Sequence, residues 1–174
     1  ALSAGLHVFL FSDGVSLADE IVVIDCCLLF PDEEMFGIDL VIPDIAYLKE
    51  RRDLVKAFLI THAHEGHVGA LPYVLSEFDV PVYGMPLTLG FVRERLREHG
   101  LSRDLRLLSP GQTQTVGTLG VESFVMTHSI PDSVGLAVRT PFGTVIHTGD
   151  FKLDQTPLDG RLPDLARLAA LGDE

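Results

Sequence analysis

The sequence predicts a single α/β domain organised as a layered sandwich, not as a doubly wound parallel sheet. Length and composition indicate one domain, because 174 residues that are 47% hydrophobic and 22% charged can form a packed core but leave no room for a second full-sized domain. Short β-branched runs ending in Gly, Pro or Asp recur along the chain, and helical patterns separate only some of them. Early and late strands that form hairpins, with helices between them, favour the sandwich.

The strand predictions follow apolar, β-branched runs that are bounded by turn residues. In chain order, strands are expected at residues 7–11, 20–25, 57–61, 80–83, 121–127, 135–140 and 144–148. The last two flank Pro141, Phe142 and Gly143, which predicts that they form a hairpin.

Two helices are expected in the middle of the chain. Residues 68–77 follow a histidine-rich loop and carry apolar side chains at a spacing of three to four. Residues 86–99 begin with a proline, which suits the first turn of a helix, and meet Gly100 as a stop. Residues 171–174 show no clear pattern, and we expect them to be irregular.

Charge and hydropathy exclude several classes of partner. The chain has 13 basic and 25 acidic residues and a formal net charge of −12, which argues against broad attraction to nucleic acid or to anionic lipid. Contact with RNA would need a local positive patch or a partner segment. No apolar run approaches the roughly 18 to 20 residues that cross a bilayer, and residues 1–30 lack a secretory signal pattern. We therefore expect no membrane association.

The two cysteines, Cys26 and Cys27, are adjacent in the sequence. Neighbouring cysteines rarely reach disulfide geometry, so the pair indicates a reducing, cytoplasmic setting.

The stretch most informative about chemistry is residues 58–67, where an apolar strand runs directly into three histidines, His62, His64 and His67. Imidazole is a common ligand of zinc, and two histidines one residue apart at a strand end can face one ion. Three histidines in six positions are difficult to explain as core residues.

Two later segments repeat this pattern of an apolar strand that delivers a polar side chain. The strand around residues 121–127 is followed by His128, and the one around residues 144–148 is followed by Asp150. Either residue alone would commonly cap a turn. Their order after the first histidine motif favours a shared metal site.

At these motifs the sequence resembles the metallo-β-lactamase superfamily, whose signature is H-x-H-x-D-H, then a lone His, then a strand-end Asp. It is similar above all to the RNA-processing ribonuclease J group, through the stretches IDCCLLFPDE (24–33), IDLVIPD (38–44), THSIPDS (127–133) and HTGDFK (147–152). The resemblance covers roughly residues 20–160. It implies an αβ/βα sandwich, of which residues 1–174 would be the N-terminal portion, without the β-CASP domain and the C-terminal part.

The resemblance also implies roles for single residues. His62, His64 and His128 would hold a first zinc ion, while Asp150 would bridge towards a second ion that His67 serves. Asp150 and His67 would act directly in catalysis. Two further residues would support the site: Asp25 would orient a ligand histidine, and Ser129 would lie near the substrate phosphate.

The sequence departs from the family pattern at Gly66, where the family has an aspartate ligand. A further family histidine comes from beyond the β-CASP domain. We therefore expect one Zn²⁺ ion with a second held weakly, and Mn²⁺ as an alternative metal. Glu65 could replace the missing carboxylate only by turning inward. Cys27 stands where the family has glycine and would be either a packed small side chain or a soft ligand or oxidisable thiol.

The implied function is a metal-dependent hydrolase that cleaves RNA phosphodiester bonds with a metal-activated hydroxide, weakened by Gly66 and by truncation. Its partners would be RNA and a second copy or a complementing protein segment. Two alternatives stay open: a degenerate, non-catalytic metal-binding module that acts through protein contacts, and a small one-zinc hydrolase of a β-lactam or a thioester.

Overall fold

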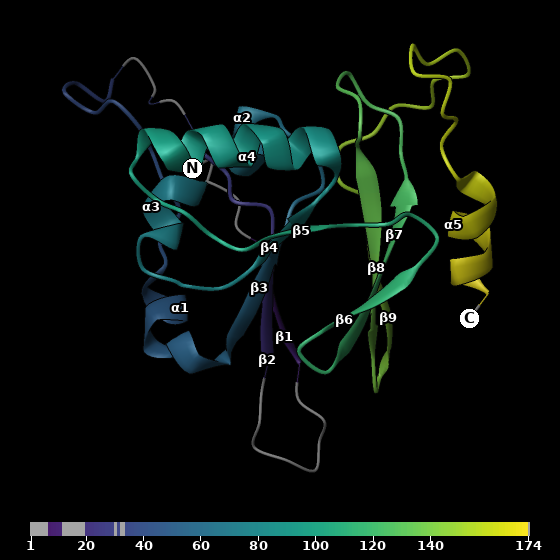
Figure 1. Ribbon diagram of the computed structural model, residues 1–174, viewed down its shortest axis with the longest axis horizontal. Coiled ribbons are helices and arrows are strands. Elements are labelled where there is room, and N and C mark those ends of the chain that lie inside the picture. Colours follow the sequence, from purple (N-terminus) through teal and green to yellow (C-terminus); the bar gives the residue numbers. More distant parts are fainter. Residues whose placement is uncertain (1–6, 12–19, 30, 32–33, 174) are drawn as a thin grey trace.

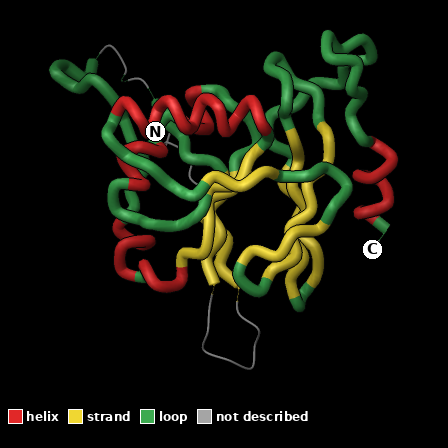
Figure 2. The backbone as a smooth tube through the Cα atoms, viewed as in Figure 1, coloured by secondary structure: helices red, strands yellow, loops and turns green. Residues whose placement is uncertain are grey.

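The computed structural model describes residues 7–11, 20–29, 31 and 34–173, and within these it has two β-sheets packed face to face. Figure 1 shows helices on the outer side of each sheet, and Figure 2 shows the strands as two facing layers between them. The chain therefore folds as the α/β sandwich that the sequence predicts.

The first sheet is mainly parallel. Its strands, in spatial order, are β1 (His7–Phe11), β2 (Glu20–Ile24), β3 (Val55–Leu59), β4 (Val82–Gly84) and β5 (Leu105–Leu107). Only β1 runs antiparallel to its neighbour. The outer face of this sheet is covered by α1 (Ala46–Glu50), α2 (Glu65–Val68), α3 (Leu71–Leu75) and α4 (Pro86–Glu98), with a 3₁₀ turn at Arg52–Leu54.

The second sheet is antiparallel throughout. Its strands, in spatial and chain order, are β6 (Thr113–Val116), β7 (Leu119–Val125), β8 (Val134–Thr140) and β9 (Gly143–His147). Helix α5 (Leu165–Gly172) lies on its outer face, where Leu171 packs with Phe124.

Two cores result from the alternation of side chains along the central strands. Ile21 and Val23 of β2 face the helices, whereas Val22 and Ile24 face the second sheet. All four are fully buried, because both faces of this sheet are covered. The apolar run around β2 is thus explained by its position inside the sandwich.

A buried carboxylate joins α5 to the second sheet. Glu122 of β7 accepts hydrogen bonds from Arg167 Nε of α5 at 2.6 Å and from an Arg139 guanidinium nitrogen of β8 at 2.8 Å. The hydrogen bonds from Arg167 and Arg139 lower the pKa of Glu122 to about 2. The C-terminal helix is therefore held by charge as well as by packing.

The seven expected strands all form, with ends within two residues of those predicted, and the hairpin of β8 and β9 is confirmed. The helix expected at 68–77 forms only over Leu71–Leu75, as α3, and Val68 is the last residue of α2. The two helices are separate because Pro72, in the first turn of α3, has no N–H to bond the Val68 carbonyl of a continuous helix. The expectation that residues 171–174 are irregular is wrong for Leu171 and Gly172, which belong to α5.

Two smaller expectations concern cysteines and membranes. Cys26 and Cys27 are both free thiols, as predicted for neighbours in sequence. Among the described residues, no helix has the length and apolar character needed to span a bilayer.

Candidate metal centre

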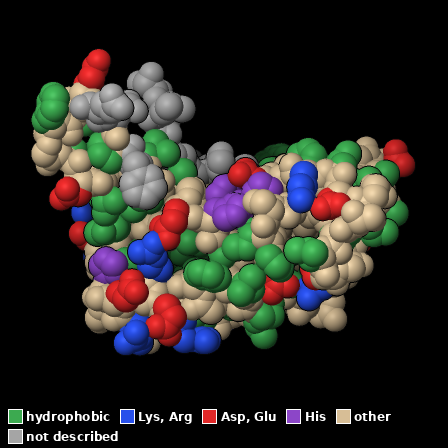
Figure 3. Space-filling model, turned by 90° about the horizontal axis from the view of Figure 1, so that it is seen from above, with side chains coloured by type: hydrophobic (Ala, Val, Ile, Leu, Met, Phe, Trp, Pro, Cys, Tyr) green, Lys and Arg blue, Asp and Glu red, His purple; other side chains and the backbone are tan. Residues whose placement is uncertain are grey.

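The histidines singled out in the sequence converge where strands of both sheets end. His62 and His64 follow β3 and His67 lies in α2, while His128 follows β7 and Asp150 follows β9. Figure 3 shows histidine side chains gathered on one face of the molecule. The structure thus brings together all five residues expected to bind metal.

Three of the imidazoles form a compact group. His62, His64 and His128 each offer one ring nitrogen, and these nitrogens lie within 4.8 Å of one another. His62 Nε2 is 3.1 Å from His64 Nδ1, and the ring centroids of both lie under 5 Å from that of His128. Three nitrogens that face a common point form the donor set typical of a zinc site.

Asp150 lies between this group and a second one. A second group with the same spacing consists of His62, His67 and Asp150. Asp150 Oδ2 is 3.4 Å from His67 Nε2 and 3.8 Å from His128 Nε2. The carboxylate therefore belongs to the second group and lies beside one member of the first, while His62 is the residue common to both groups.

Asp25 fixes the orientation of His67 from below the site. It is buried directly after β2 with a left-handed φ of +59°, a conformation that aspartate tolerates better than most residues. Its Oδ2 is 2.8 Å from His67 Nδ1, so His67 presents Nε2 to Asp150. The supporting role expected for Asp25 agrees with this geometry.

Thr61 connects Asp25 to His62. The Thr61 hydroxyl donates to Asp25, with Oγ1 2.9 Å from Oδ2, and the Thr61 backbone N–H donates to Oδ1 at 2.8 Å. The hydroxyl oxygen then accepts from Nδ1 of His62 at 2.9 Å, which leaves Nε2 of His62 as the free lone pair. Gly149 packs against this hydroxyl: its φ is +61°, and a Cβ there would lie 3.0 Å from Thr61 Cβ.

The imidazoles differ in charge preference. Burial, with the neighbouring His67, lowers the pKa of His62 to about 3, and burial with the neighbouring His64 lowers that of His128. Burial also opposes the charged form of His67, but the hydrogen bond and charge of Asp25, with the charge of Asp150, raise its pKa overall. His62 and His128 are thus neutral at pH 7, the state in which imidazole can bind a cation.

Few other side chains near the five residues are placed to add a ligand. Glu65 forms an ion pair with Arg95 of α4 and belongs to neither group of ligands, so it does not replace the missing carboxylate. Nothing lies within 4 Å of where a Cβ of Gly66 would be. Cys27 likewise belongs to neither group of possible metal ligands found among the described residues. Ser129 is close: its hydroxyl is 3.4 Å from Nε2 of His64.

Sequence reasoning missed Thr61 and Arg95. Thr61 directly precedes His62, and a hydroxyl at that position is a usable signal, but its partner Asp25 is 36 residues away. Arg95 belongs to an arginine-rich helix that by itself indicates only a solvated face.

Comparison with known families decides what kind of protein carries this site. Residues 18–170 match the family described as the metallo-beta-lactamase superfamily. The chain belongs to this superfamily. The superfamily implies a divalent metal, and a donor set of three close imidazoles with a neighbouring carboxylate fits one.

Curated relatives within the superfamily are much longer than this chain. A protein named ribonuclease J from Thermus thermophilus is 48% identical over 165 residues, which are 90% of this chain and 29% of that protein. Ribonuclease J 1 from Streptococcus pyogenes is 44% identical over 163 residues, 92% of this chain and 29% of that protein. The chain thus spans less than a third of the relatives it matches.

Solved structures agree in fold. The structure of the MIM-2 metallo-beta-lactamase aligns with a TM-score of 0.57 at 20% identity, covering 83% of this chain and 54% of that one. This likeness confirms the metallo-beta-lactamase sandwich expected from the sequence.

Proposed function

We propose that this chain is the metal-binding part of a metal-dependent ribonuclease of the ribonuclease J type, which hydrolyses RNA phosphodiester bonds. The observation that carries the proposal is the convergence of His62, His64 and His128 from both sheets, with Asp150 beside them. The 48% identity to a protein named ribonuclease J supports RNA as the substrate. The activity of the longer protein is part of this proposal.

The ligands are assigned as follows. His62, His64 and His128 would hold one Zn²⁺ ion, with Asp150 as the nearest carboxylate, 3.8 Å from His128. His67, with a share of Asp150, serves a second ion that is held weakly, because Gly66 offers no ligand atom. Mn²⁺ is a second candidate metal, since imidazole and carboxylate accept both.

The protein's own groups position the reaction. When bound, the ion supplies Lewis-acid chemistry that polarises a phosphodiester and makes water a better nucleophile. Asp150, whose side chain is 56% exposed, would accept a proton from the attacking water at the mouth of the site, where its Oδ2 lies 3.4 Å from His67 Nε2. The Ser129 hydroxyl orients a phosphate oxygen, and Asp25 holds His67 in place.

The setting follows from charge and thiols. With a net charge of −12, the chain needs a basic complementing segment to retain long RNA. A second copy is the other partner that we propose, but it would add no positive charge. The free cysteines Cys26 and Cys27 suit the reducing cytoplasm. We propose that residues 1–174 form the metallo-β-lactamase-like domain and that a β-CASP domain and a C-terminal part lie outside this sequence.

A second candidate function is a non-catalytic module that binds one metal ion and acts through protein contacts. Two observations favour it. Gly66 leaves open space where a carboxylate ligand is expected, and Glu65 forms an ion pair with Arg95.

Metal analysis combined with RNA cleavage separates the two candidates. The purified chain should contain about one zinc per molecule by elemental analysis and should slowly cleave a 5′-monophosphorylated RNA oligonucleotide. The double variant His62→Ala/His64→Ala should lose both, whereas His99→Ala, on the surface away from the cluster, should keep both. Wild-type cleavage no faster than that of the double variant would refute the ribonuclease proposal and favour the non-catalytic module.

A further inference from the structure

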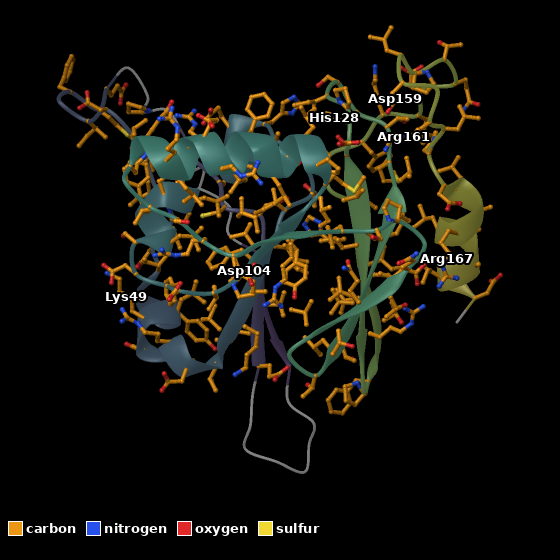
Figure 4. All side chains as sticks on the ribbon, viewed as in Figure 1. Lys49, Asp104, His128, Asp159, Arg161 and Arg167 are labelled. Carbon is orange, nitrogen blue, oxygen red and sulfur yellow. The ribbon has the colours of Figure 1, made fainter. Side chains whose placement is uncertain are left out.

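A cavity of about 110 Å³ adjoins the metal centre. It lies between the turn that follows β7 and the loop that follows Asp150, and its wall includes His128 and Ser129. Figure 4 shows His128, Asp159 and Arg161 at the same end of the molecule. A group attached to a phosphate at the metal centre can therefore reach into this cavity.

The size and walls of the cavity suit one planar ring. Its volume is well below the roughly 300–1,000 Å³ of pockets that enclose a whole drug-sized ligand. Apolar surface is contributed by Met126, Ile130 and Pro157, of which Met126 is buried and the other two are half-buried. Proteins that read single-stranded RNA commonly hold splayed bases against such surface while polar groups read the base edges.

The charges in the wall disfavour a second phosphate. Lys152 and Arg161 line the cavity, but each is already paired: Lys152 Nζ is 3.0 Å from Asp154 Oδ2, and an Arg161 nitrogen is 3.1 Å from Asp132 Oδ1. Asp159 is a third carboxylate in the wall, 3.9 Å from Arg161. Three carboxylates against two cations make the cavity an unfavourable place for an anion.

The same carboxylates select between bases. An ionised carboxylate only accepts hydrogen bonds, so it pairs with the exocyclic amino groups of cytosine, adenine or guanine and not with the carbonyl that uracil carries in the corresponding place. The one ring donor on the pairing edge of uracil, N3–H, is flanked by two carbonyls, which would repel the same carboxylate. Asp159 has the greatest free capacity, since Oδ1 accepts only the Arg161 backbone N–H at 3.1 Å and its Oδ2 contact is long.

We propose that this cavity binds the nucleobase adjoining the scissile phosphate and prefers a base with an exocyclic amino group, so that cytosine is favoured over uracil. The inference rests on the proposed function for its ligand class, a nucleotide, but it concerns binding and not cleavage.

Binding of mononucleotides to the zinc-loaded chain tests the proposal. Cytidine and uridine 5′-monophosphates differ at the amino group and its ring nitrogen, and ribose 5-phosphate lacks the base. We expect cytidine monophosphate to bind about tenfold more tightly than uridine monophosphate, the size of one hydrogen bond to a charged acceptor. Ribose 5-phosphate should bind weakest. Isothermal titration calorimetry gives the three affinities.

Two variants keep the test specific. Asp159→Ala should reduce the preference for cytosine to about twofold or less, whereas Asp79→Ala, with the same charge change outside the cavity, should leave it intact. Equal affinities for the three ligands, or no binding by any of them, would overturn the proposal even if the chain cleaves RNA. A retained cytosine preference in a chain that does not cleave RNA would support the cavity while refuting the ribonuclease.

Discussion

Asp25 Oδ2 lies 2.8 Å from Nδ1 of His67, so a buried carboxylate after β2 sets which nitrogen of a histidine in α2 faces the metal centre. The contact joins two residues that are 42 positions apart. It explains why Asp25 adopts a left-handed backbone at the end of a strand, where most residues would be strained.

Replacing Asp25 should weaken metal binding without unfolding the chain. Asp25→Asn keeps the shape and tolerates the left-handed backbone, but it lowers the basicity of His67 and replaces one acceptor by a donor. Changes to groups that orient metal ligands typically cost 10–100-fold in affinity, and we expect a loss in that range. Zinc competition with a fluorescent chelator measures it. Asp44→Asn, which removes the charge of an exposed carboxylate that accepts the Ala46 backbone N–H, serves as control, and equal affinities in the two variants would contradict the role of Asp25.

The Thr61 hydroxyl should be needed for the same reason. Thr61→Val preserves shape but leaves the buried Asp25 with one donor fewer and His62 without its acceptor. We expect a loss of about 1–3 kcal/mol in the free energy of unfolding, together with weaker zinc binding. Thr61→Ser keeps the hydroxyl and should restore zinc affinity. If the Thr61→Ser variant binds zinc as poorly as the Thr61→Val variant, the hydroxyl is not what supports zinc binding, and the prediction fails.

Gly66→Asp should raise the occupancy of a second ion. Position 66 is helical and has open space around it, so an aspartate fits without displacing a neighbour. Its carboxylate would add a ligand beside His67. Elemental analysis of the zinc-loaded variant should give more metal per chain than the parent, while Gly66→Ala, which adds no ligand atom, should not. Unchanged occupancy would mean that a ligand from outside this sequence limits the second ion.

Glu122 should make stability depend on acid pH. Its pKa is about 2 in the folded chain, held there by Arg167 and Arg139, against about 4.3 when unfolded. The carboxylate therefore contributes stability above pH 4.3, and this contribution, about 3 kcal/mol, is lost as the pH falls towards 2. Urea unfolding of Glu122→Gln should show a loss of about 3 kcal/mol at pH 7 and a smaller difference near pH 2.5. A matched change at the surface, Glu94→Gln, should have little effect at either pH. A constant difference across this range would show that Glu122 acts through packing alone.

The sequence predicted the elements whose signal is local. Every predicted strand is present because β-branched runs buried on both faces, such as β2, leave little choice of structure. The run of residues 68–77 was misread because its apolar periodicity continues across the break, although Pro72, which lacks an N–H, marks the start of a separate helix. Strand β5 was missed because three residues with two exposed side chains carry almost no pattern. Helix α5 was missed although it carries a pattern, since Leu165, Leu168 and Leu171 repeat every three residues.

The site shows the same division. The strand-end positions of His62, His128 and Asp150 could be predicted because each follows an apolar run, and their convergence follows from the sandwich. The link through Thr61 and the engagement of Glu65 by Arg95 could not, because each depends on a side chain from another element. The residues of the cavity wall could not be predicted either, because they come from two loops that only the fold brings together.

The proposed metal ligands come from both halves of the sandwich, His62 and His64 from one sheet and His128 and Asp150 from the other. An ion bound by these residues would connect the two sheets across their interface. Sliding of one sheet over the other would separate the donor atoms, so the bound ion would stabilise the arrangement in which they are close. The metal affinity would thus also report how firmly the relative position of the two sheets is fixed.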